Sequence, residues 1–553
     1  MRIALLAEGG YPYARGEGSA WVDRLVRGLD ANEFAVYTLG RSERADAAGL
    51  LELPPQVTAV RTLPLWGQAP RAAAAGTKAR RRRSLVLEHY RDLVGTLAGD
   101  VGANGVADRF ASALYGLAGL AREDGGVPAL LRSELALRVL EDACRAPGAR
   151  PLVADAGVGD LMAVADQLER ALRPLAAPWY DEFGDALATA DLAHAVTGGT
   201  ALLPALLAKR FFGTPLLITE YGVRLRETLL AHRAAGLPAP VRALLAAFHR
   251  RLAGEAYREA ALVTPGNAHA RRWQEHCGAD RERLRTVHPG YQGTVPGPVE
   301  TGGGDPALVW VGRIEPGKDL IALLHAFGEV RRQEPGARLR IVRGGDADPA
   351  YLHHCRALAA QLFPDEAADA VTVGESPVTF EELGAPGAPG LADAYAAGDV
   401  VVLSSIVEGF PLSLVEAMFC GRATVSTDVG AVREVIGGTG LVVPPRNPRA
   451  LAEACVTLLR DPERRQRLGA AARERALELF TVEQNIAAFR EIYLDLVAHA
   501  PGRDGPLRDE DGAPVPFGRP AEAHVPGRWT AAPTWARARR EPALAGSERQ
   551  ARA

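Results

Sequence analysis

The first half of the chain alternates short apolar runs with longer segments in which apolar residues recur every three or four positions. Such runs are typical of buried strands, and the periodic segments between them are typical of amphipathic helices. The alternation predicts a parallel sheet with helices on both faces. The expected strands are Arg2–Ala7, Phe34–Gly40, Leu192–Gly199, Pro215–Gly222, Ala261–Gly266 and Leu284–Gly290, and the expected helices are Ala20–Leu29, Ala201–Phe212 and Val241–Ala260.

The same alternation restarts after residues 293–306, whose glycine and proline content is typical of a linker. It predicts a second doubly wound domain. Its expected strands are Ala307–Arg313, Arg338–Gly345, Ala370–Gly374, Val400–Ser405 and Ala423–Thr427, and its expected helices are Leu320–Glu334, Ala350–Phe363, Leu391–Ala397, Arg449–Leu459 and Pro462–Leu496.

The fold class is therefore α/β, with two facing Rossmann-like domains. Residues 1–292 form the N-terminal domain, into which an alanine- and leucine-rich helical insertion is placed at about 71–184. Residues 307–480 form the C-terminal domain, and a closing helix follows at 481–500. Residues 501–553 are rich in proline and arginine without apolar periodicity, so we expect a disordered tail.

Composition excludes several classes of protein. The 553 residues are 47% hydrophobic and 24% charged, with a formal net charge of -3, which does not favour a nucleic-acid partner. The five cysteines are scattered without a C-x-x-C pair, as in thiols of a reducing cytoplasm. The apolar run at the N-terminus is too short for a signal peptide, and no other run is long enough to span a bilayer. We expect a cytoplasmic protein whose contact with a membrane, if it has any, is peripheral.

The segment 405–427 carries the strongest candidate chemistry. Glu408 and Glu416 stand eight positions apart, on either side of a Gly-Phe-Pro-Leu turn that opens a helix. Backbone N–H groups at such a turn bind anions. The two carboxylates are poorly suited to phosphate but well suited to accept hydrogen bonds from sugar hydroxyls. The pattern indicates a ligand with a central diphosphate and a sugar ring at each end.

A second motif lies where the first strand of the C-terminal domain ends. Arg313 follows Gly312 at the strand end, and Lys318 comes five residues later at a predicted helix start. A guanidinium fork and an ammonium can bracket a diphosphate. Taken alone, two cations in a surface loop are more often solvated charges. The equivalent position of the Glu408 turn, at another strand end of the same domain, favours the binding role.

These motifs, with residues 428–436, resemble retaining glycosyltransferase family 4, whose members have the GT-B fold. The match covers roughly 307–445 and, more weakly, residues 1–499. The resemblance implies that Arg313 and Lys318 bind the donor diphosphate. It also implies that Glu416 holds the nucleotide ribose and that Glu408 contacts donor-sugar hydroxyls. The implied donor-binding residues are Gly16, Gly18, Gly312, Arg313, Lys318, Glu408, Gly409, Phe410, Pro411, Leu412 and Glu416.

The N-terminal loop resembles that of the subgroup containing the Pel exopolysaccharide glycosyltransferase. Two positions depart from the subgroup pattern: Glu17 interrupts a double glycine, and Tyr221 stands where a histidine is common. We assign both to the acceptor side. His194 ends a predicted strand that should face the cleft, and a catalytic role competes there with a structural one.

The resemblance implies a retaining hexosyltransferase that moves a hexose, with UDP-glucose the expected donor, to a polysaccharide or other glycan acceptor. Glu408, Arg313, Lys318 and His194 are the candidate catalytic residues. No Asp-x-Asp pair lies in a suitable loop, so neither a metal nor a cofactor is expected. A nucleotide-sugar epimerase and a non-catalytic nucleotide-sugar-binding subunit are the alternatives.

The densest positive charge is the basic run 78–83. It is either a solvated exposed loop or a contact with an anionic membrane surface or polyanionic acceptor. Peripheral contact with the inner membrane surface or a polysaccharide synthase complex is the corresponding partner prediction.

Overall fold

The structure is a computed structural model that describes residues 1–13, 17–40, 51–66, 77–100, 104–123, 126–180, 187–291, 297–298, 305–364, 376–386, 388, 390–500, 507–508 and 514–515. Most of the expected linker 293–306 and the expected strand Ala370–Gly374 lie outside these residues. So does the tail beyond residue 500, apart from the short antiparallel pair β13 (Leu507–Arg508) and β14 (Pro514–Val515).

The N-terminal domain is built on a six-stranded parallel sheet of order β3-β2-β1-β4-β5-β6. Its strands are β1 (Arg2–Glu8), β2 (Glu33–Gly40), β3 (Val57–Pro64), β4 (Leu192–Ala195), β5 (Leu216–Glu220) and β6 (Leu262–Pro265). The principal helices of this domain outside the insertion are α1 (Glu17–Gly28), α9 (Leu202–Phe212), α10 (Arg224–Ala234), α11 (Ala239–Glu259) and α12 (Ala268–His276). The expected strand Leu284–Gly290 is wrong: Leu284 makes one isolated bridge to Val263.

The C-terminal domain repeats this topology in the order β12-β11-β10-β7-β8-β9. Its strands are β7 (Ala307–Ile314), β8 (Arg338–Ala347), β9 (Val378–Glu382), β10 (Val400–Leu403), β11 (Ala423–Thr427) and β12 (Leu441–Val443). Its helices include α13 (Leu320–Gln333), α14 (Pro349–Leu362), α15 (Leu391–Ala396), α16 (Leu412–Phe419), α17 (Val432–Ile436) and α18 (Pro448–Arg460). Two doubly wound parallel sheets confirm the expected GT-B fold.

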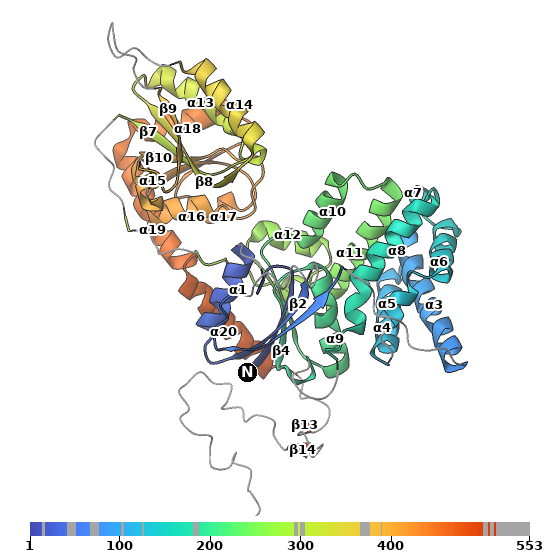
Figure 1. The fold of residues 1–553 in the computed structure, drawn as a ribbon. Coiled ribbons are helices and arrows are strands. Elements are labelled where there is room, and N and C mark those ends of the chain that lie inside the picture. The colour runs from blue at the N-terminus through green and yellow to red at the C-terminus, as the bar shows by residue number, and fades with distance from the viewer. Residues whose placement is uncertain are drawn as a thin grey trace, which may run out of the picture.

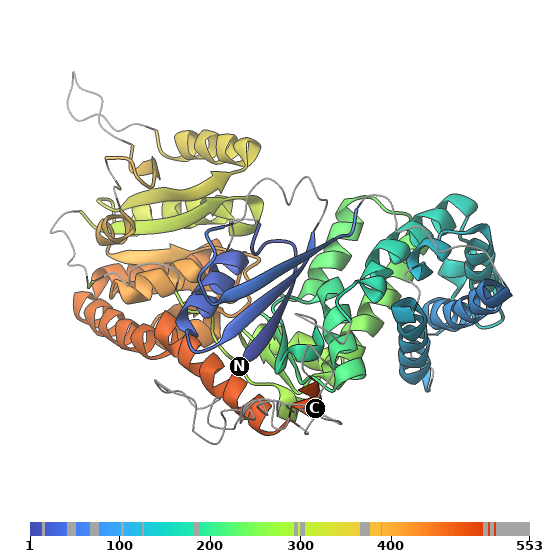
Figure 2. The ribbon, with the colours of Figure 1, turned by 60° about the horizontal axis from the view of Figure 1, so that its bottom comes forward.

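The helical insertion lies on the side of the N-terminal domain that faces away from the C-terminal domain (Figures 1 and 2). It comprises α3 (Thr77–Ala98), α4 (Val106–Glu123), α5 (Val127–Leu130), α6 (Glu134–Arg145), α7 (Pro151–Ala154) and α8 (Val158–Leu172). Its apolar faces share one buried core with α11 and the sheet, including Leu93, Leu114 and Phe248. The basic run stands on the first turns of α3, where Arg82 pairs with Glu123 of α4.

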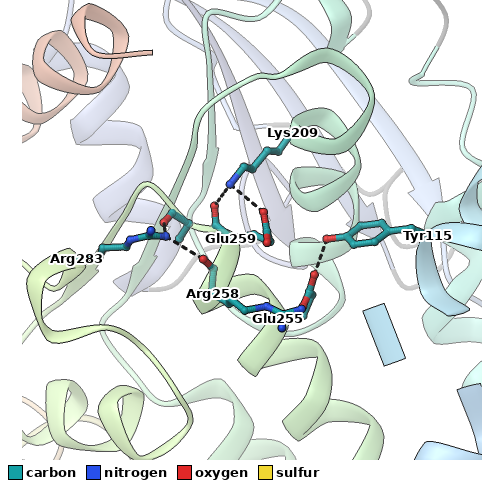
Figure 3. A network of polar contacts seen from close by, with 7 residues as sticks. Tyr115, Lys209, Glu255, Arg258, Glu259 and Arg283 are labelled. Atoms are coloured by element: carbon teal, nitrogen blue, oxygen red, sulfur yellow. Dashed lines mark hydrogen bonds and ion pairs between the residues drawn. The ribbon is translucent and has the colours of Figure 1, made fainter. Parts of the chain in front are cut away.

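A network of charged side chains fixes α11 to its neighbours (Figure 3). Glu255, almost fully buried, accepts a hydrogen bond from the Tyr115 hydroxyl of α4 at 2.8 Å and pairs with Arg258. The Lys209 ammonium of α9 lies 2.9 Å from the Glu259 carboxylate. These contacts join α4 of the insertion to α11, and α11 to α9. They therefore fix the position of the insertion relative to the rest of the N-terminal domain.

The end of the folded chain crosses back to the N-terminal domain. The single helix expected over 462–496 is broken into α19 (Pro462–Leu479) and α20 (Val482–Ala498). The side chain of Thr481 caps the second helix by accepting from Gln484 N at 3.2 Å. Helix α20 then packs beside α1, where Trp21 donates to Asn485 Oδ1 at 3.0 Å (Figure 2). Among the described helices, none combines the length and apolar character that crossing a bilayer demands.

Candidate functional site

The candidate site begins at the point where the strand order of the second sheet reverses. Strands β7 and β10 are neighbours there, and their carboxyl-terminal loops carry the two sequence motifs. Ligands of doubly wound folds bind at such switch points. The loops are joined by Ile406 N donating to Gly317 O at 2.9 Å and by Ser404 Oγ donating to Lys318 O at 2.7 Å. The topology therefore brings together two motifs that are far apart in the sequence.

Lys318 and Glu408 form an ion pair across these loops. The Lys318 ammonium lies 2.6 Å from Glu408 Oε2, and their side chains are only 14% and 12% exposed. The Ser405 hydroxyl donates to the same carboxylate oxygen at 3.0 Å. An ammonium has three donors, so Lys318 can hold Glu408 and still bind an anion. Oε1 of Glu408 and the remaining Lys318 donors are thus the groups available to a ligand.

Arg313 is less constrained. Its side chain is 61% exposed, and its nearest carboxylate oxygen, on Glu315, is 3.9 Å away. The aliphatic stem lies over Gly345, where a Cβ would be 3.5 Å from Arg313 Cγ. Its guanidinium can therefore turn toward a ligand without breaking a strong contact.

Glu416 lies one turn inside α16 and is half-buried. The Tyr395 hydroxyl donates to its Oε2 at 2.9 Å and to Ser413 O at 3.0 Å. Burial, with the negative charge of Glu416 second, raises the pKa of Tyr395 well above its ordinary value, so this phenol remains a donor. The carboxylate is held in a fixed orientation, as recognition of a ribose would require.

A cavity of about 510 Å³ lies between the two domains. Gly409, Phe410 and Leu412 line it from the C-terminal domain, and Gly18 and Tyr221 line it from the N-terminal domain. Arg313, Lys318, Glu408 and Glu416 are not among its lining residues. The cavity therefore contacts the turn before α16, which directly follows Glu408 in the chain.

The N-terminal wall of the cavity carries charged residues that the sequence analysis missed. Glu8 ends β1; it pairs with Arg224 at 3.2 Å and accepts from Thr200 N and Oγ1 at 2.7 Å. Glu220 ends β5 and is buried, with hydrogen bonds from Tyr257 and Gln274. Burial raises the pKa of the Glu220 carboxyl above its ordinary value, although these hydrogen bonds oppose the shift. Both residues could have been found from the sequence, because each is a carboxylate at the carboxyl end of a parallel strand, where ligands of this fold bind.

His194 does not face the cleft, so that expectation was wrong. Its ring is fully buried, with Nδ1 2.7 Å from the Tyr493 hydroxyl and Nε2 2.7 Å from Thr219 Oγ1. Phe489 of α20 stacks on it with ring centroids 5.6 Å apart. Both ring nitrogens are used inside the core, so His194 links β4 to α20.

Of the two residues predicted to lie on the acceptor side, the structure describes the side chain of Tyr221 but not that of Glu17. The Tyr221 hydroxyl accepts from Asn485 Nδ2 at 2.9 Å, and its ring meets Trp21 edge-on at 4.8 Å. Gly16 and the Glu17 side chain lie outside the described residues, and Gly18 stands exposed in the first turn of α1. Of the remaining predicted residues, Gly312 lies within β7, and Pro411 belongs to the turn that directly precedes α16. Within the described ranges, no three His, Cys, Asp or Glu residues are grouped as a metal site would need.

Two families match this chain in sequence. Residues 1–282 match the family described as "Domain of unknown function (DUF3492)", and residues 305–461 match "Glycosyl transferases group 1". The second match covers β7 to α18 and includes both motifs of the candidate site.

Curated proteins similar to this chain include D-inositol 3-phosphate glycosyltransferases. The protein of Kineococcus radiotolerans is 33% identical over 262 residues, covering 43% of this chain and 58% of the relative. That of Frankia alni is 34% identical over 218 residues, covering 36% and 50%. The chain thus spans about half the length of the curated relatives it matches.

Solved structures share the fold at low sequence identity. Sucrose-phosphate synthase of Thermosynechococcus elongatus aligns with a TM-score of 0.50 at 18% identity, over 90% of this chain and 99% of that chain. Anabaena HepE in complex with UDP aligns with a TM-score of 0.50 at 15% identity, over 89% and 99%. These likenesses show the fold alone. Because the first family match spans just over half of the 553 residues, the chain belongs to the DUF3492 family, with a C-terminal domain of the glycosyl transferases group 1 type.

Proposed function

We propose that the protein is a retaining glycosyltransferase that moves a hexose from a nucleotide sugar to a glycan acceptor. The motif resemblance leads us to favour UDP-glucose as the donor. It also leads us to favour a relationship to the subgroup that contains the Pel exopolysaccharide glycosyltransferase. The observation that carries the proposal is the ion pair of Lys318 and Glu408 at the switch point of the second sheet. It stands beside a cavity that both domains line.

The charges suit departure of a nucleoside diphosphate. Negative charge develops on the leaving oxygens as the glycosidic bond breaks, and preorganised cations lower that barrier. Lys318 supplies a fixed ammonium and Arg313 a guanidinium that can turn inward. Glu408 accepts hydrogen bonds from donor-sugar hydroxyls, while Glu416 holds the ribose. The donor phosphate oxygen takes the acceptor proton, so attack occurs on the face from which the diphosphate leaves.

The first experiment identifies the donor. A thermal-shift panel of UDP-, GDP- and ADP-sugars is followed by mass spectrometry of products formed from the best binder with glycan acceptors. We expect a glycosylated acceptor and released nucleoside diphosphate. A converted sugar nucleotide in the absence of acceptor would instead indicate an epimerase. Binding without turnover on any acceptor would indicate a non-catalytic subunit.

The second experiment tests the site. Glu408→Ala and Lys318→Ala should each lower kcat/KM for transfer at least tenfold, about 1.4 kcal/mol of the barrier. Glu453→Gln is the control, because that carboxylate is 60% exposed on α18, in an i,i+4 surface pair. Unchanged turnover in both site variants would refute the assignment. Contact with the inner membrane surface or a synthase complex stays a prediction.

A further inference from the structure

Four arginines gather where the helical insertion meets the core of the N-terminal domain. We call Arg109 of α4, Arg150 before α7, and Arg250 and Arg251 of α11 the arginine cluster. Arg251 lies within electrostatic reach of the other three. Burial, with the repulsion of these neighbouring guanidiniums second, lowers the pKa of Arg251. The cluster is therefore a concentration of like charge whose members are not among the residues that line the interdomain cavity.

Two members of the cluster have a structural role in which their hydrogen bonds are made to neutral carbonyl groups. Arg150 donates to Leu97 O at 2.6 Å, and Arg251 donates to Thr96 O at 3.0 Å. Cations at these last carbonyls of α3 complement the helix dipole. The acceptors are neutral, however, and Arg150 Nε and Arg251 Nη2 are buried without a hydrogen-bond partner among the described residues. Helix capping thus explains their position but not the surplus of guanidiniums.

The other two members have no structural partner. The side chains of Arg109 and Arg250 make no ion pair or hydrogen bond with any residue that the structure describes. The adjacent carboxylates Asp108 and Glu255 are both engaged by Arg258. Asp100 faces Arg150 and offsets part of the charge. The balance at the cluster remains positive.

The cluster adjoins hollows of suitable size. One hollow of about 310 Å³ lies between α4 and α11 and is lined by Ala107, Arg250, Arg251, Glu255 and Arg258. Glu255 and Arg258 appear in Figure 3. Beyond the Arg251–Thr96 contact, a second hollow of about 620 Å³ is lined by Arg91 and Arg109, with Asp100 and Asp142 on its wall. Small-molecule sites commonly have such volumes. The first turn of the 18-residue helix α4 adds its positive dipole end.

We propose that the arginine cluster binds a small, multiply charged oxyanion, such as a phosphate ester, in the hollow between α4 and α11. Arg250, which lines this hollow with Arg251, supplies a planar fork that matches phosphate oxygens, and Arg109, Arg150 and Arg251 supply a fixed positive field around it. A bound oxyanion removes the repulsion among the four guanidiniums. It therefore fastens the insertion to α11, independently of the proposed donor site.

The test uses the full chain and inorganic pyrophosphate as the probe. We expect pyrophosphate to raise the thermal unfolding midpoint more than chloride at equal ionic strength. The double variant Arg109→Gln/Arg250→Gln should lose this difference and raise the apparent Kd at least tenfold. It should also unfold no earlier than the parent without anion, because repulsion is relieved. Lys318→Ala should keep the response, which separates this site from the donor cleft.

The control Arg449→Gln/Arg467→Gln replaces two exposed arginines of the C-terminal domain, 85% and 71% exposed. Three results would overturn the proposal. These are an unchanged pyrophosphate response in the cluster variant, an equal response to chloride, and crystals soaked in tungstate without density between α4 and α11. Density there that disappears in the cluster variant would support it.

Discussion

At the scale of single residues, the Lys318–Glu408 pair shows how the proposed donor-binding groups are held in position in the free protein. Both side chains are mostly buried, and each would be costly to bury alone. The pair satisfies this requirement while leaving unused donors on Lys318 and one carboxylate oxygen on Glu408. In the proposed complex, the donor diphosphate binds Lys318 and the donor hydroxyls bind Glu408. These contacts replace the contact that the two side chains make with each other in the free protein. The site thus needs no large side-chain rearrangement.

His194 gives a pH-dependent stability that can be measured. Burial lowers its pKa to about 3 from an ordinary 6.5, so only the unfolded state takes up its proton between these values. This contribution to stability is present above pH 6.5 and is lost as pH falls toward 3, by about 1.4 kcal/mol per pH unit. Denaturant unfolding from pH 6.5 to 5 should show a shallower decline in His194→Asn than in the parent.

The control for that measurement is His353→Asn, which replaces an exposed histidine on α14. Parallel stability profiles of the parent and His194→Asn would contradict the assignment. His194 also marks a limit of sequence reasoning. Its partner Tyr493 lies 299 positions away, on a helix that returns from the other domain. A strand-end position is visible in the sequence, but a side chain covering it from so far along the chain is not.

At the scale of elements, the loop that carries Glu408 depends on close backbone contact with the loop before α17. Gly430 has a φ of +55°, and a Cβ there would lie 2.1 Å from Glu408 O. Ala431 N also donates to Gly409 O at 3.1 Å. We expect Gly430→Ala to displace the Glu408 loop and to lower kcat/KM for transfer at least tenfold, measured by initial rates. The protein should remain folded, because the collision lies between two loops and not within a strand or helix.

Gly438→Ala separates this displacement from backbone strain. Gly438 also has a positive φ, +91°, but a Cβ there would meet nothing within 4 Å. Ala at either position adopts an unfavourable conformation, yet only Gly430→Ala collides with the Glu408 loop. Equal losses of activity in the two variants would show that the contact with Glu408 is unimportant.

Elements with buried faces were the predictable ones. β1, β10 and β11 are buried on both faces, so their runs of apolar or β-branched residues stand out in the sequence. The edge strands β3 and β9 are half-exposed and alternate with polar residues, and neither was expected. The break between α19 and α20 was also missed within one periodic pattern, because Thr481 caps a helix without interrupting the apolar spacing.

At the scale of the whole molecule, the two domains are connected by two chain crossings and by contacts beside the cleft. The Glu434 carboxylate of α17 accepts from Ala268 N, at the start of α12, at 2.6 Å. His288 Nε2 lies 3.7 Å from the same carboxylate, and its ring stacks on Phe410 with centroids 6.2 Å apart. The turn before α16 is therefore in contact with the N-terminal side of the cleft, and its position depends on where the N-terminal domain lies. The angle between the domains should therefore affect the proposed donor site directly.

The two crossings touch at Gly290, so this glycine tests that coupling. A Cβ at Gly290 would lie 2.7 Å from Val482 Cα and 3.0 Å from Thr481 O, which are backbone atoms that cannot turn aside. We expect Gly290→Ala to push the crossings apart, to change the small-angle scattering profile, and to lower kcat/KM at least tenfold. Gly297→Ala is the matched control in the same connection, since a Cβ there meets nothing within 4 Å. If Gly290→Ala kept both the scattering profile and the kcat/KM of the parent, contact between the crossings would not set the angle between the domains. Domain closure would then have to depend on the Glu434 and His288 contacts alone.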